Sequence, residues 1–490
     1  MNRWIARHLV WPITERMLSR DTLHRYRSLR KTDLAPASVL ADIQMRKLRR
    51  IFSAVNAHCS FYHERFHSAG IDATDPQLGL DALKKLPLLN RSDIRENLDA
   101  MTWHDCPGGP AQPYTTGGSS GEPLQFYFDR GRQATDWATR LRHRSWWNLS
   151  PGDRELMIWA GPVRRSTCDR LRIWRDRLLN QQMLDAFNMS EATLRDYANR
   201  IRRDRPQLLY GYASSLALLA RHLLKRGDVL TSHSLIDDMV AGNESTDDAS
   251  REPHKLREFR ELRAVFVTGE TVTPQDAADI RSAFGAPVVI EYGARDGGLI
   301  ACACPAGRLH VADENIIVEV LDENGQPVQP GGVGEVVITN LEAFATPMIR
   351  YRIGDIARVG DNWHNDAEDR RCPCGRASSQ LLEVHGRTTD QIVRMDGQQV
   401  RRMHALSLIY VLREMECLKQ FRIVQQEVQK LIVEVVADER FTPTHEQNML
   451  RSLQERMGPD VNITVARCQQ ITPTKSGKHA CVISHVKMAE

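Results

Sequence analysis

The chain has 490 residues, of which 66 are basic, 62 are acidic and 41% are hydrophobic. This composition excludes a predominantly disordered protein, and the net charge of +4 argues against a nucleic-acid-binding protein. No apolar run approaches the roughly 18 residues of a membrane-spanning helix, so no transmembrane segment is predicted. Ten cysteines are too few for a disulfide scaffold, and their clustering predicts a metal site in a reducing cytoplasm.

The first segment of the chain carries an apolar stripe, because Ile5, Leu9 and Ile13 follow one another at intervals of four. Arg3 and Arg7 interrupt any signal-peptide core, so we expect the segment to stay attached. Two interpretations remain open: a first helix that docks on its own domain, which we favour, and peripheral contact with a membrane surface.

The middle of the chain alternates short apolar runs with helical patterns, after a first hundred residues that read as helices. This alternation is typical of an α/β sheet with helices on its faces. From residue 315 the period drops towards two, which predicts a small β region. The predicted strands are 156–160, 208–210, 264–268 and 288–292, and the predicted helices are 39–57, 190–204, 214–225 and 276–284. A capped helix start is predicted near Asn90 to Arg95.

The pattern restarts near residues 384–389 and continues as an independent α+β unit. The predicted fold class is therefore α/β, with mixed sheets, flanking helices and the small β region in a large N-terminal domain at 1–385. A small, mobile α+β C-terminal domain follows at 386–490. Residues 241–253, rich in Asn, Ser, Thr and Asp, predict a mobile surface loop.

A run of small and hydroxyl residues stands just before the predicted strand at 124–128. Its peptide N–H groups and hydroxyls suit phosphate oxygens. A kinase-type loop needs G-x-x-x-x-G-K-[ST] entering a helix, so this is a different phosphate loop, or alternatively a hairpin turn. The run consists of Thr115, Thr116, Gly117, Gly118, Ser119, Ser120 and Gly121.

Further candidate residues lie at strand ends, where α/β sheets bind ligands, and in later short motifs. Each of these motifs is weak evidence for a ligand site by itself, and it is their order along the chain that indicates a function. In chain order they are Gly269, Glu270, Tyr292, Gly293, Asp296, Asp355, Arg387 and Lys478.

In this order the motifs resemble those of the adenylate-forming superfamily, and within it the phenylacetate-CoA ligase-like and CapK-like branch. The resemblance implies an enzyme that activates a small-molecule carboxylate with ATP through an acyl-adenylate, as an acid–thiol ligase with coenzyme A as the preferred acceptor. It also implies that Lys478 bridges the carboxylate and the α-phosphate, while Arg387 reaches the nucleotide from the domain junction. Asp355 would accept both ribose hydroxyls, Thr115–Gly121 would hold the phosphates, and Gly269, Glu270, Tyr292 and Gly293 would line the adenine.

Two positions depart from the family pattern. Arg295 and Asp296 stand where Ser or Thr followed by Glu is usual, and Thr389 stands at the hinge position. Asp296 retains a carboxylate for Mg²⁺, one methylene shorter. Arg295 either clamps a phosphate or a substrate carboxylate, or it fills a pocket that no longer works.

A second group of residues predicts structural zinc. Cys304, His310, Cys372 and Cys374 supply a Cys₃His set, and Cys302 is then spare. The pairs are C-x-C rather than C-x-x-C, so buried unpaired thiols are the alternative. The phenylacetate-CoA ligase-like branch carries a similar Cys and His pattern, which implies zinc that joins the sheet to the β region.

Other functions remain open. The acceptor can be an amine or a hydroxyl in surface-polysaccharide biosynthesis, as the CapK-like resemblance allows, or the fold can be a degenerate nucleotide-binding scaffold. A zinc-containing nucleic-acid binder is disfavoured, because the arginine runs at 140–144, 164–177 and 200–205 are interpreted as solvated helix faces.

Overall fold

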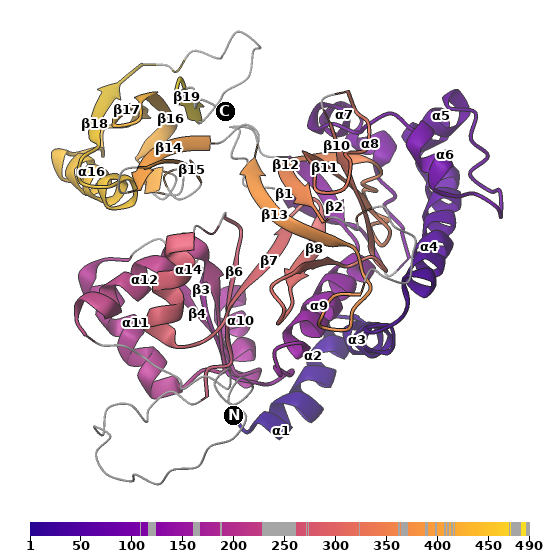
Figure 1. The fold of residues 1–490 in the computed structure, drawn as a ribbon, viewed down its shortest axis with the longest axis horizontal. Helices are drawn as coiled ribbons and strands as arrows, with labels where there is room; N and C mark the ends of the chain where they lie inside the picture. Colours follow the sequence, from indigo (N-terminus) through magenta and orange to yellow (C-terminus); the bar gives the residue numbers. More distant parts are fainter. Residues whose placement is uncertain are drawn as a thin grey trace.

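The computed structural model describes the chain except residues 108, 116–123, 160–166, 187–188, 228–260, 271, 273, 323, 361–362, 364–370, 388–390, 397–398, 406–407, 409–410, 413–414, 416, 470, 472–481 and 487–490. The predicted surface loop at 241–253 lies outside the described residues. A large α/β unit and a smaller C-terminal unit make up the fold (Figure 1).

The chain begins with short helices that cover one side of the large unit (Figure 1). The helix predicted at 39–57 is present as the longest of them, α4. The predicted start near Asn90 is confirmed by a capping box, in which the side chains of Asn90 and Asp93 each accept a backbone N–H. The elements are α1 (Arg3–Ile5), a π-helical turn η1 (Ala6–Val10), α2 (Trp11–Met17), α3 (Thr22–Lys31), α4 (Ala37–His58), α5 (Ser60–Ser68), α6 (Leu80–Lys85), α7 (Arg91–Glu96) and α8 (Leu98–Met101).

An eleven-stranded sheet forms the centre of the large unit, in the order β10-β11-β12-β13-β9-β8-β7-β6-β5-β3-β4. Its parallel part and the associated helices match the predicted alternation. The strands of this part are β3 (Glu155–Trp159), β4 (Gln181–Asp185), β5 (Leu208–Tyr212), β6 (Ala264–Thr268) and β7 (Val288–Ala294). The helices are α9 (Arg130–Ser145), α10 (Thr167–Leu178), α11 (Glu191–Asp204), α12 (Ala213–Lys225) and α14 (Pro274–Phe284).

The predicted β region continues this sheet in antiparallel fashion from β7 onwards. A separate two-stranded ribbon, β1 with β2, lies before α9. The antiparallel strands are β8 (Gly298–Ala303), β9 (Leu309–Val311), β10 (Ile316–Leu321), β11 (Val333–Asn340), β12 (Tyr351–Val359) and β13 (Gln380–Arg387), and the ribbon consists of β1 (Gln112–Thr115) and β2 (Gln125–Phe128).

The C-terminal unit has its own sheets and its own apolar core. Strand β13 of the large sheet runs to Arg387, and β14, which contributes to the second core, begins at Gln391. The boundary at 386 stays a prediction. The elements are β14 (Gln391–Asp396), β15 (Gln399–His404), β16 (Leu418–Glu427), β17 (Lys430–Ala437), α16 (Pro443–Met457), β18 (Asn462–Arg467) and β19 (Val482–Ser484). The predicted fold class is confirmed.

The interpretation of the run at 140–144 as a solvated helix face is wrong. The side chains of Arg142 and Arg144 on α9 are only 4% and 7% exposed. Arg142 contacts Glu314 at 2.5 Å, and Arg144 contacts Glu155 at 2.6 Å. A basic helix packs against the sheet because buried carboxylates of the next strand, β3, and of the distant residue Glu314 neutralise its arginines.

No helix among the described residues is long and apolar enough to cross a membrane.

These buried pairs predict a specific loss of stability. Arg142→Leu leaves the Glu314 carboxylate buried without its ionic partner, so the free energy of unfolding should fall by about 3–5 kcal/mol, measured by urea denaturation. Breaking the exposed pair between Arg352 and Glu335 with Arg352→Leu is the matched control and should cost only about 0–1 kcal/mol. Equal losses in the two variants would contradict the assignment of α9 as an ionic anchor.

Candidate functional site

Two of the residues predicted to contact the nucleotide meet at a buried hydrogen bond. The Tyr292 hydroxyl, on β7, donates to Oδ2 of Asp355, on β12, over 2.8 Å. Both side chains are at least nine-tenths buried. An ionised carboxylate has several acceptor positions, so Asp355 can hold this phenol and still accept further O–H donors.

A third predicted residue lies next to this pair along the sheet. In the antiparallel pairing of β12 with β13, Asp355 is directly opposite Arg387 in the backbone register. Residues that oppose one another in this way lie within about 5.5 Å at their Cα atoms. The last residue of β13 therefore stands beside the predicted ribose carboxylate.

Gly293 allows β7 and β8 to approach each other closely at this point. A Cβ atom on Gly293 would lie 2.8 Å from the carbonyl oxygen of Gly298. The register of β7 with β8 shifts between Tyr292 and Gly293. A glycine is therefore required by the strand packing here, whatever ligand the neighbouring residues hold.

Glu270 follows β6, and its carboxylate lies at the N-terminus of α12. Its Oε2 accepts the backbone N–H of Ser214 over 2.9 Å, and a carboxylate at a helix N-terminus is favourable. Burial raises the pKa of Glu270, while the hydrogen bonds of Ser214 and the charge of Arg456 oppose that rise. Arg456 comes from α16 of the C-terminal unit, so a charge of the small unit acts on a predicted adenine-lining residue.

Gly269, the other predicted residue after β6, adopts a positive φ of 76°. A Cβ atom there would lie 3.2 Å from the ring of Tyr212, which stacks on Trp159 with a centroid distance of 4.1 Å. The tight turn after β6 therefore packs its backbone against an aromatic pair.

Asp296 occupies a buried polar network rather than an open position. Its carboxylate accepts the Tyr351 hydroxyl at 2.7 Å and pairs with the Arg91 guanidinium at 3.2 Å. Burial would lower the pKa of Arg91, but Tyr351 and Asp296 outweigh this effect and raise it. These contacts give Asp296 a structural role in this network, and its predicted ligation of Mg²⁺ stays a prediction.

Arg132 on α9 holds the backbone of the turn that contains Arg295 and Asp296. Its Nη2 donates to the carbonyl oxygens of Arg295 and Asp296, and each hydrogen bond is 2.9 Å long. Its guanidinium also lies 4.3 Å from the ring centroid of Phe128 on β2. A single fully buried side chain thus fixes the Arg295 turn to the ribbon that precedes α9.

The predicted phosphate loop connects the two strands of this ribbon. Thr115, its first residue, is exposed and pairs with Gln125 across β1 and β2. Residues 116–121, which include the predicted Thr116, Gly117, Gly118, Ser119, Ser120 and Gly121, lie outside the described residues, as do Thr389 and Lys478. The Arg295 guanidinium lies 5.9 Å from the ring centroid of Tyr114, so this arginine, which departs from the family pattern, lies beside β1 of the ribbon.

The four predicted zinc ligands converge. The ligand atoms of Cys304, His310, Cys372 and Cys374 all lie within 4.8 Å of one another. Sγ of Cys304 is 3.7 Å from Sγ of Cys372, and Sγ of Cys374 is 3.4 Å from Nε2 of His310. A tetrahedral zinc ion with Zn–S bonds of about 2.3 Å places its sulfur ligands about 3.8 Å apart, so the donor set fits zinc.

Two equivalent turns present the cysteines. In the first, the N–H of Cys304 donates to the carbonyl of Arg308 and the N–H of Gly307 donates to the carbonyl of Cys304. Cys372, Gly375 and Arg376 repeat both hydrogen bonds. The sequence carries the same signal, because C-P-x-G-R occurs at 304–308 and again at 372–376. That repeat is a stronger indication of paired metal-binding turns than the C-x-C spacing.

Neighbouring side chains hold this Cys/His cluster in place. Nδ1 of His310 lies 2.9 Å from Oγ of Ser378, which leaves Nε2 to face the thiols. Burial opposes ionisation of Cys374, but hydrogen bonds from His310 and Arg376 outweigh it and lower the pKa of this thiol to about 5. Arg376 also pairs with Asp33 at 2.9 Å and so connects the cluster to the segment between α3 and α4.

Sequence reasoning missed several residues that shape the site. Arg91, Arg132 and Arg456 contact or influence predicted residues from elements far away in the chain. Arg91 directly follows the predicted cap residue, which is the only hint that the sequence offers for it. Tyr351 was visible as the first residue of the Tyr-Arg-Ile-Gly-Asp segment, but its phenol could not be paired with Asp296 from sequence.

Comparison with solved structures shows what fold carries these residues. The chain superposes on 2-hydroxyisobutyryl-CoA ligase in the postadenylation state in complex with R3-HIB-AMP with a TM-score of 0.57, over 93% of this chain and 91% of that chain at 18% identity. The same enzyme in complex with 2-HIB-AMP and CoA in its thioesterification state gives the same TM-score and coverage. The chain therefore shares the fold of this CoA ligase.

Comparison with known sequences finds two related proteins and one matching family model. The chain is 20% identical to Protein CapK of Staphylococcus aureus over 485 residues, covering 96% of this chain and 94% of that protein. It is 21% identical to phenylacetate-coenzyme A ligase of Thermus thermophilus over 380 residues, covering 73% and 72%. The family model of the CapK C-terminal domain matches residues 392–485. The chain is therefore similar in sequence to CapK over nearly its whole length, and to the phenylacetate-coenzyme A ligase over about three quarters of it.

The network around Asp296 makes a prediction that needs no ligand. Asp296→Asn removes the charge that faces Arg91, so the free energy of unfolding should fall by about 1–3 kcal/mol in buffer without nucleotide or Mg²⁺. Urea denaturation measures this, and Asp322→Asn, in a surface turn, is the control. Unchanged stability of Asp296→Asn would contradict the structural role of this network.

Proposed function

We propose that the protein activates a small-molecule carboxylate with ATP and forms an enzyme-bound acyl-adenylate with release of pyrophosphate. The observation that carries this proposal is the meeting of Tyr292, Asp355 and the end of β13 at Arg387. These residues come from distant parts of the sequence, and each was assigned to the nucleotide by motif alone. The adenylate-forming fold and the AMP-linked ligands of the superposed enzyme support the same conclusion.

The chemistry assigned to these residues follows from charge. Asp355 accepts hydrogen bonds from the vicinal hydroxyls of a ribose, which offer two O–H donors to an acceptor-only group. Attack of a carboxylate on the α-phosphate brings two anions together, and Lys478 supplies the cation that offsets their repulsion. Arg387, the last residue of β13, would join this charge compensation, as the family resemblance implies. A nucleophilic side chain is unnecessary, because alignment and charge stabilisation account for the rate.

The second half-reaction requires an acceptor. Coenzyme A is the preferred acceptor, since the superposed ligase is described with CoA in its thioesterification state. The CapK-like similarity over nearly the whole chain favours a second candidate, in which an amine or hydroxyl of a surface-polysaccharide precursor receives the acyl group. In either case the small unit rotates about residues near Thr389, withdraws Lys478 and admits the acceptor.

Zinc is proposed as a structural ion at the Cys/His cluster. It would bind Cys304, Cys372 and Cys374 as thiolates and His310 through Nε2, and it would fix β9, the Cys304 turn and the Cys372 turn to one another. Four protein ligands leave no open position, so the ion takes no part in the reaction. The free thiols of the cluster suit a reducing cytoplasm.

Removal of Lys478 tests the proposed reaction. Lys478→Ala should lower carboxylate-dependent ATP–pyrophosphate exchange by at least about a hundredfold, because the reacting anions lose their mobile cation. ATP binding, measured by calorimetry, should stay mostly intact. Lys475→Ala, three residues earlier in the same segment, is the matched control. Exchange at the normal rate in Lys478→Ala would remove this lysine from the mechanism, and no exchange by the unaltered protein with any carboxylate would favour a nucleotide-binding scaffold.

The metal proposal has a separate readout. The purified protein should contain about one zinc per chain by plasma mass spectrometry, and Cys304→Ser or Cys372→Ser should lose it together with several degrees of melting temperature. Cys302→Ser, which changes a buried cysteine outside the four-residue cluster, should keep the metal. Zinc retained after Cys372→Ser, or absent from the unaltered protein, would favour buried unpaired thiols.

A further inference from the structure

The first turns of the chain expose an unusual amount of apolar surface. Among the described residues, fourteen large hydrophobic side chains are exposed, and seven of them precede Ser19. Ile5, Leu9, Ile13 and Met17 follow one another at intervals of four, with exposed fractions of 38%, 49%, 56% and 80%. We call the whole set the N-terminal apolar stripe; it consists of Met1, Trp4, Ile5, Leu9, Ile13, Met17 and Leu18.

The π-helical turn helps to keep the stripe on one face. In an α-helix, each residue is rotated by about 40° around the helix axis relative to the residue four positions earlier. A row of side chains at intervals of four therefore moves to another face of the helix within a few turns. The turn η1, Ala6–Val10, has i→i+5 hydrogen bonds and winds more slowly, which reduces this drift. The local geometry therefore aligns the apolar side chains.

The opposite face of the same segment is fixed to the protein. Ala6, Trp11 and Glu15 are buried, and the Trp11 ring lies 6.1 Å from that of Trp137 on α9. The Glu15 carboxylate pairs with Arg20 at 2.7 Å. The expected docking on its own domain is therefore present, and it uses the face that the stripe leaves free.

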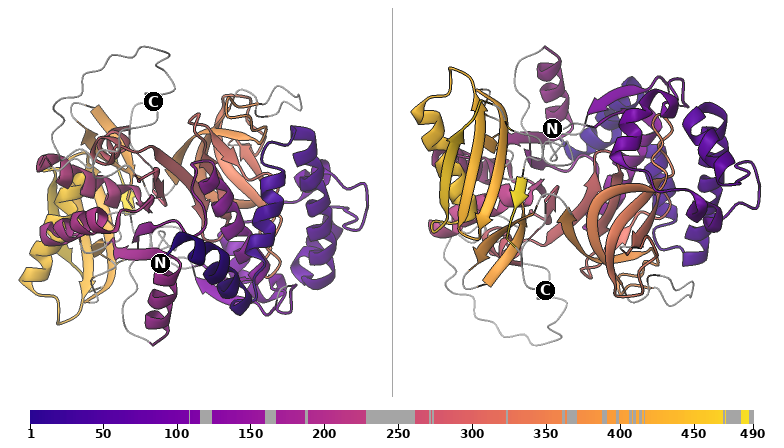
Figure 2. Two further views of the ribbon diagram at one scale, coloured as in Figure 1. Left: turned by 90° about the horizontal axis from the view of Figure 1, so that it is seen from below. Right: turned by 90° about the horizontal axis from the view of Figure 1, so that it is seen from above.

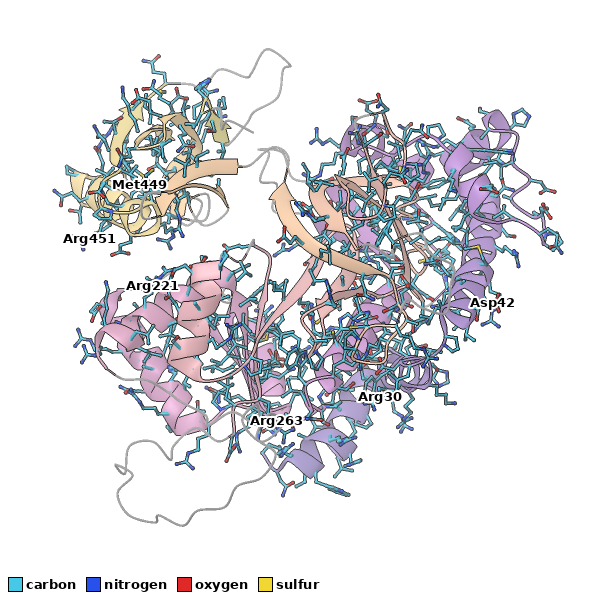
Figure 3. The ribbon with its side chains drawn as sticks, viewed as in Figure 1. Arg30, Asp42, Arg221, Arg263, Met449 and Arg451 are labelled. Atoms are coloured by element: carbon cyan, nitrogen blue, oxygen red, sulfur yellow. The ribbon has the colours of Figure 1, made fainter. Side chains whose placement is uncertain are left out.

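Basic residues outnumber acidic ones in and next to the stripe segment. Residues 1–31 contain eight Lys or Arg and two Asp or Glu, a net charge of +6, so the rest of the chain nets −2. Arg7 and Arg16 are exposed within the stripe segment, and Arg30 on α3 lies on the same lower side of the molecule (Figure 3). Helix α10 lies beside the N-terminal segment in both views of Figure 2, and its Trp174 is 63% exposed.

We propose that the N-terminal apolar stripe binds the surface of an anionic phospholipid bilayer. Ile5, Leu9 and Ile13 would enter the boundary between headgroups and acyl chains, while the surrounding arginines contact lipid phosphates. A second copy of the chain fits less well, because a symmetric pair would bring two basic segments together. This proposal does not depend on the enzymatic one, since binding can be measured without substrate.

Vesicle sedimentation with the full chain tests this proposal. The protein should bind vesicles of equal phosphatidylcholine and phosphatidylglycerol, and the triple variant Ile5→Gln/Leu9→Gln/Ile13→Gln should bind at least about tenfold more weakly. Arg7→Gln/Arg16→Gln should lower binding to these vesicles, and added salt should lower it in the unaltered protein. All the replaced side chains are exposed, so circular dichroism should show unchanged folding.

A matched variant separates the stripe from general surface hydrophobicity. Leu34→Gln/Val39→Gln/Leu80→Gln also replaces three exposed apolar residues, which are 59%, 40% and 39% exposed, and it should bind vesicles normally. Failure of the unaltered protein to bind the anionic vesicles, or an equal loss in this control, would overturn the proposal. If the unaltered protein does not bind vesicles but forms a dimer, and the triple stripe variant does not form that dimer, the stripe binds a second copy of the chain instead.

Discussion

The hydrogen bond between Tyr292 and Asp355 joins the two halves of the large sheet. Tyr292 ends the parallel part, Asp355 lies in the antiparallel part, and three other strands separate β7 from β12 in the sheet order. Because a buried carboxylate requires partners, this contact constrains how the sheet curves between its halves. The proposed nucleotide site depends on that constraint, since it draws residues from both sides.

Buried charge is the recurring means by which the large unit is held together. Glu342, 4% exposed at its side chain, contacts Arg25, Lys47 and Arg50 at 2.6–3.1 Å. Burial alone would raise the pKa of Glu342, but these three cations lower it. Together with the arginines of α9, such pairs attach the N-terminal helices to the sheet, and each one leaves a costly unpaired charge if a partner is removed.

Periodicity and local motifs predicted the elements well, because they depend on near neighbours in sequence. The strands around 264–268 and 288–292 and the capped start at Asn90 appear where the pattern placed them. The pairing of Arg91 with Asp296 was out of reach, since 205 residues separate them and one sequence offers no signal for such contacts. The same limitation made the arginines of α9 look solvated.

Strand β13 connects two features that were described separately. Its first residue, Gln380, pairs in register with His310 of the Cys/His cluster, and its last residue, Arg387, stands opposite Asp355 immediately before the small unit begins. The Cys/His cluster fixes the first residue of this strand, because His310 belongs to the cluster and pairs with Gln380. If the C-terminal unit moves as proposed, its displacement would reach the predicted ribose carboxylate Asp355 through the last residue of this eight-residue strand.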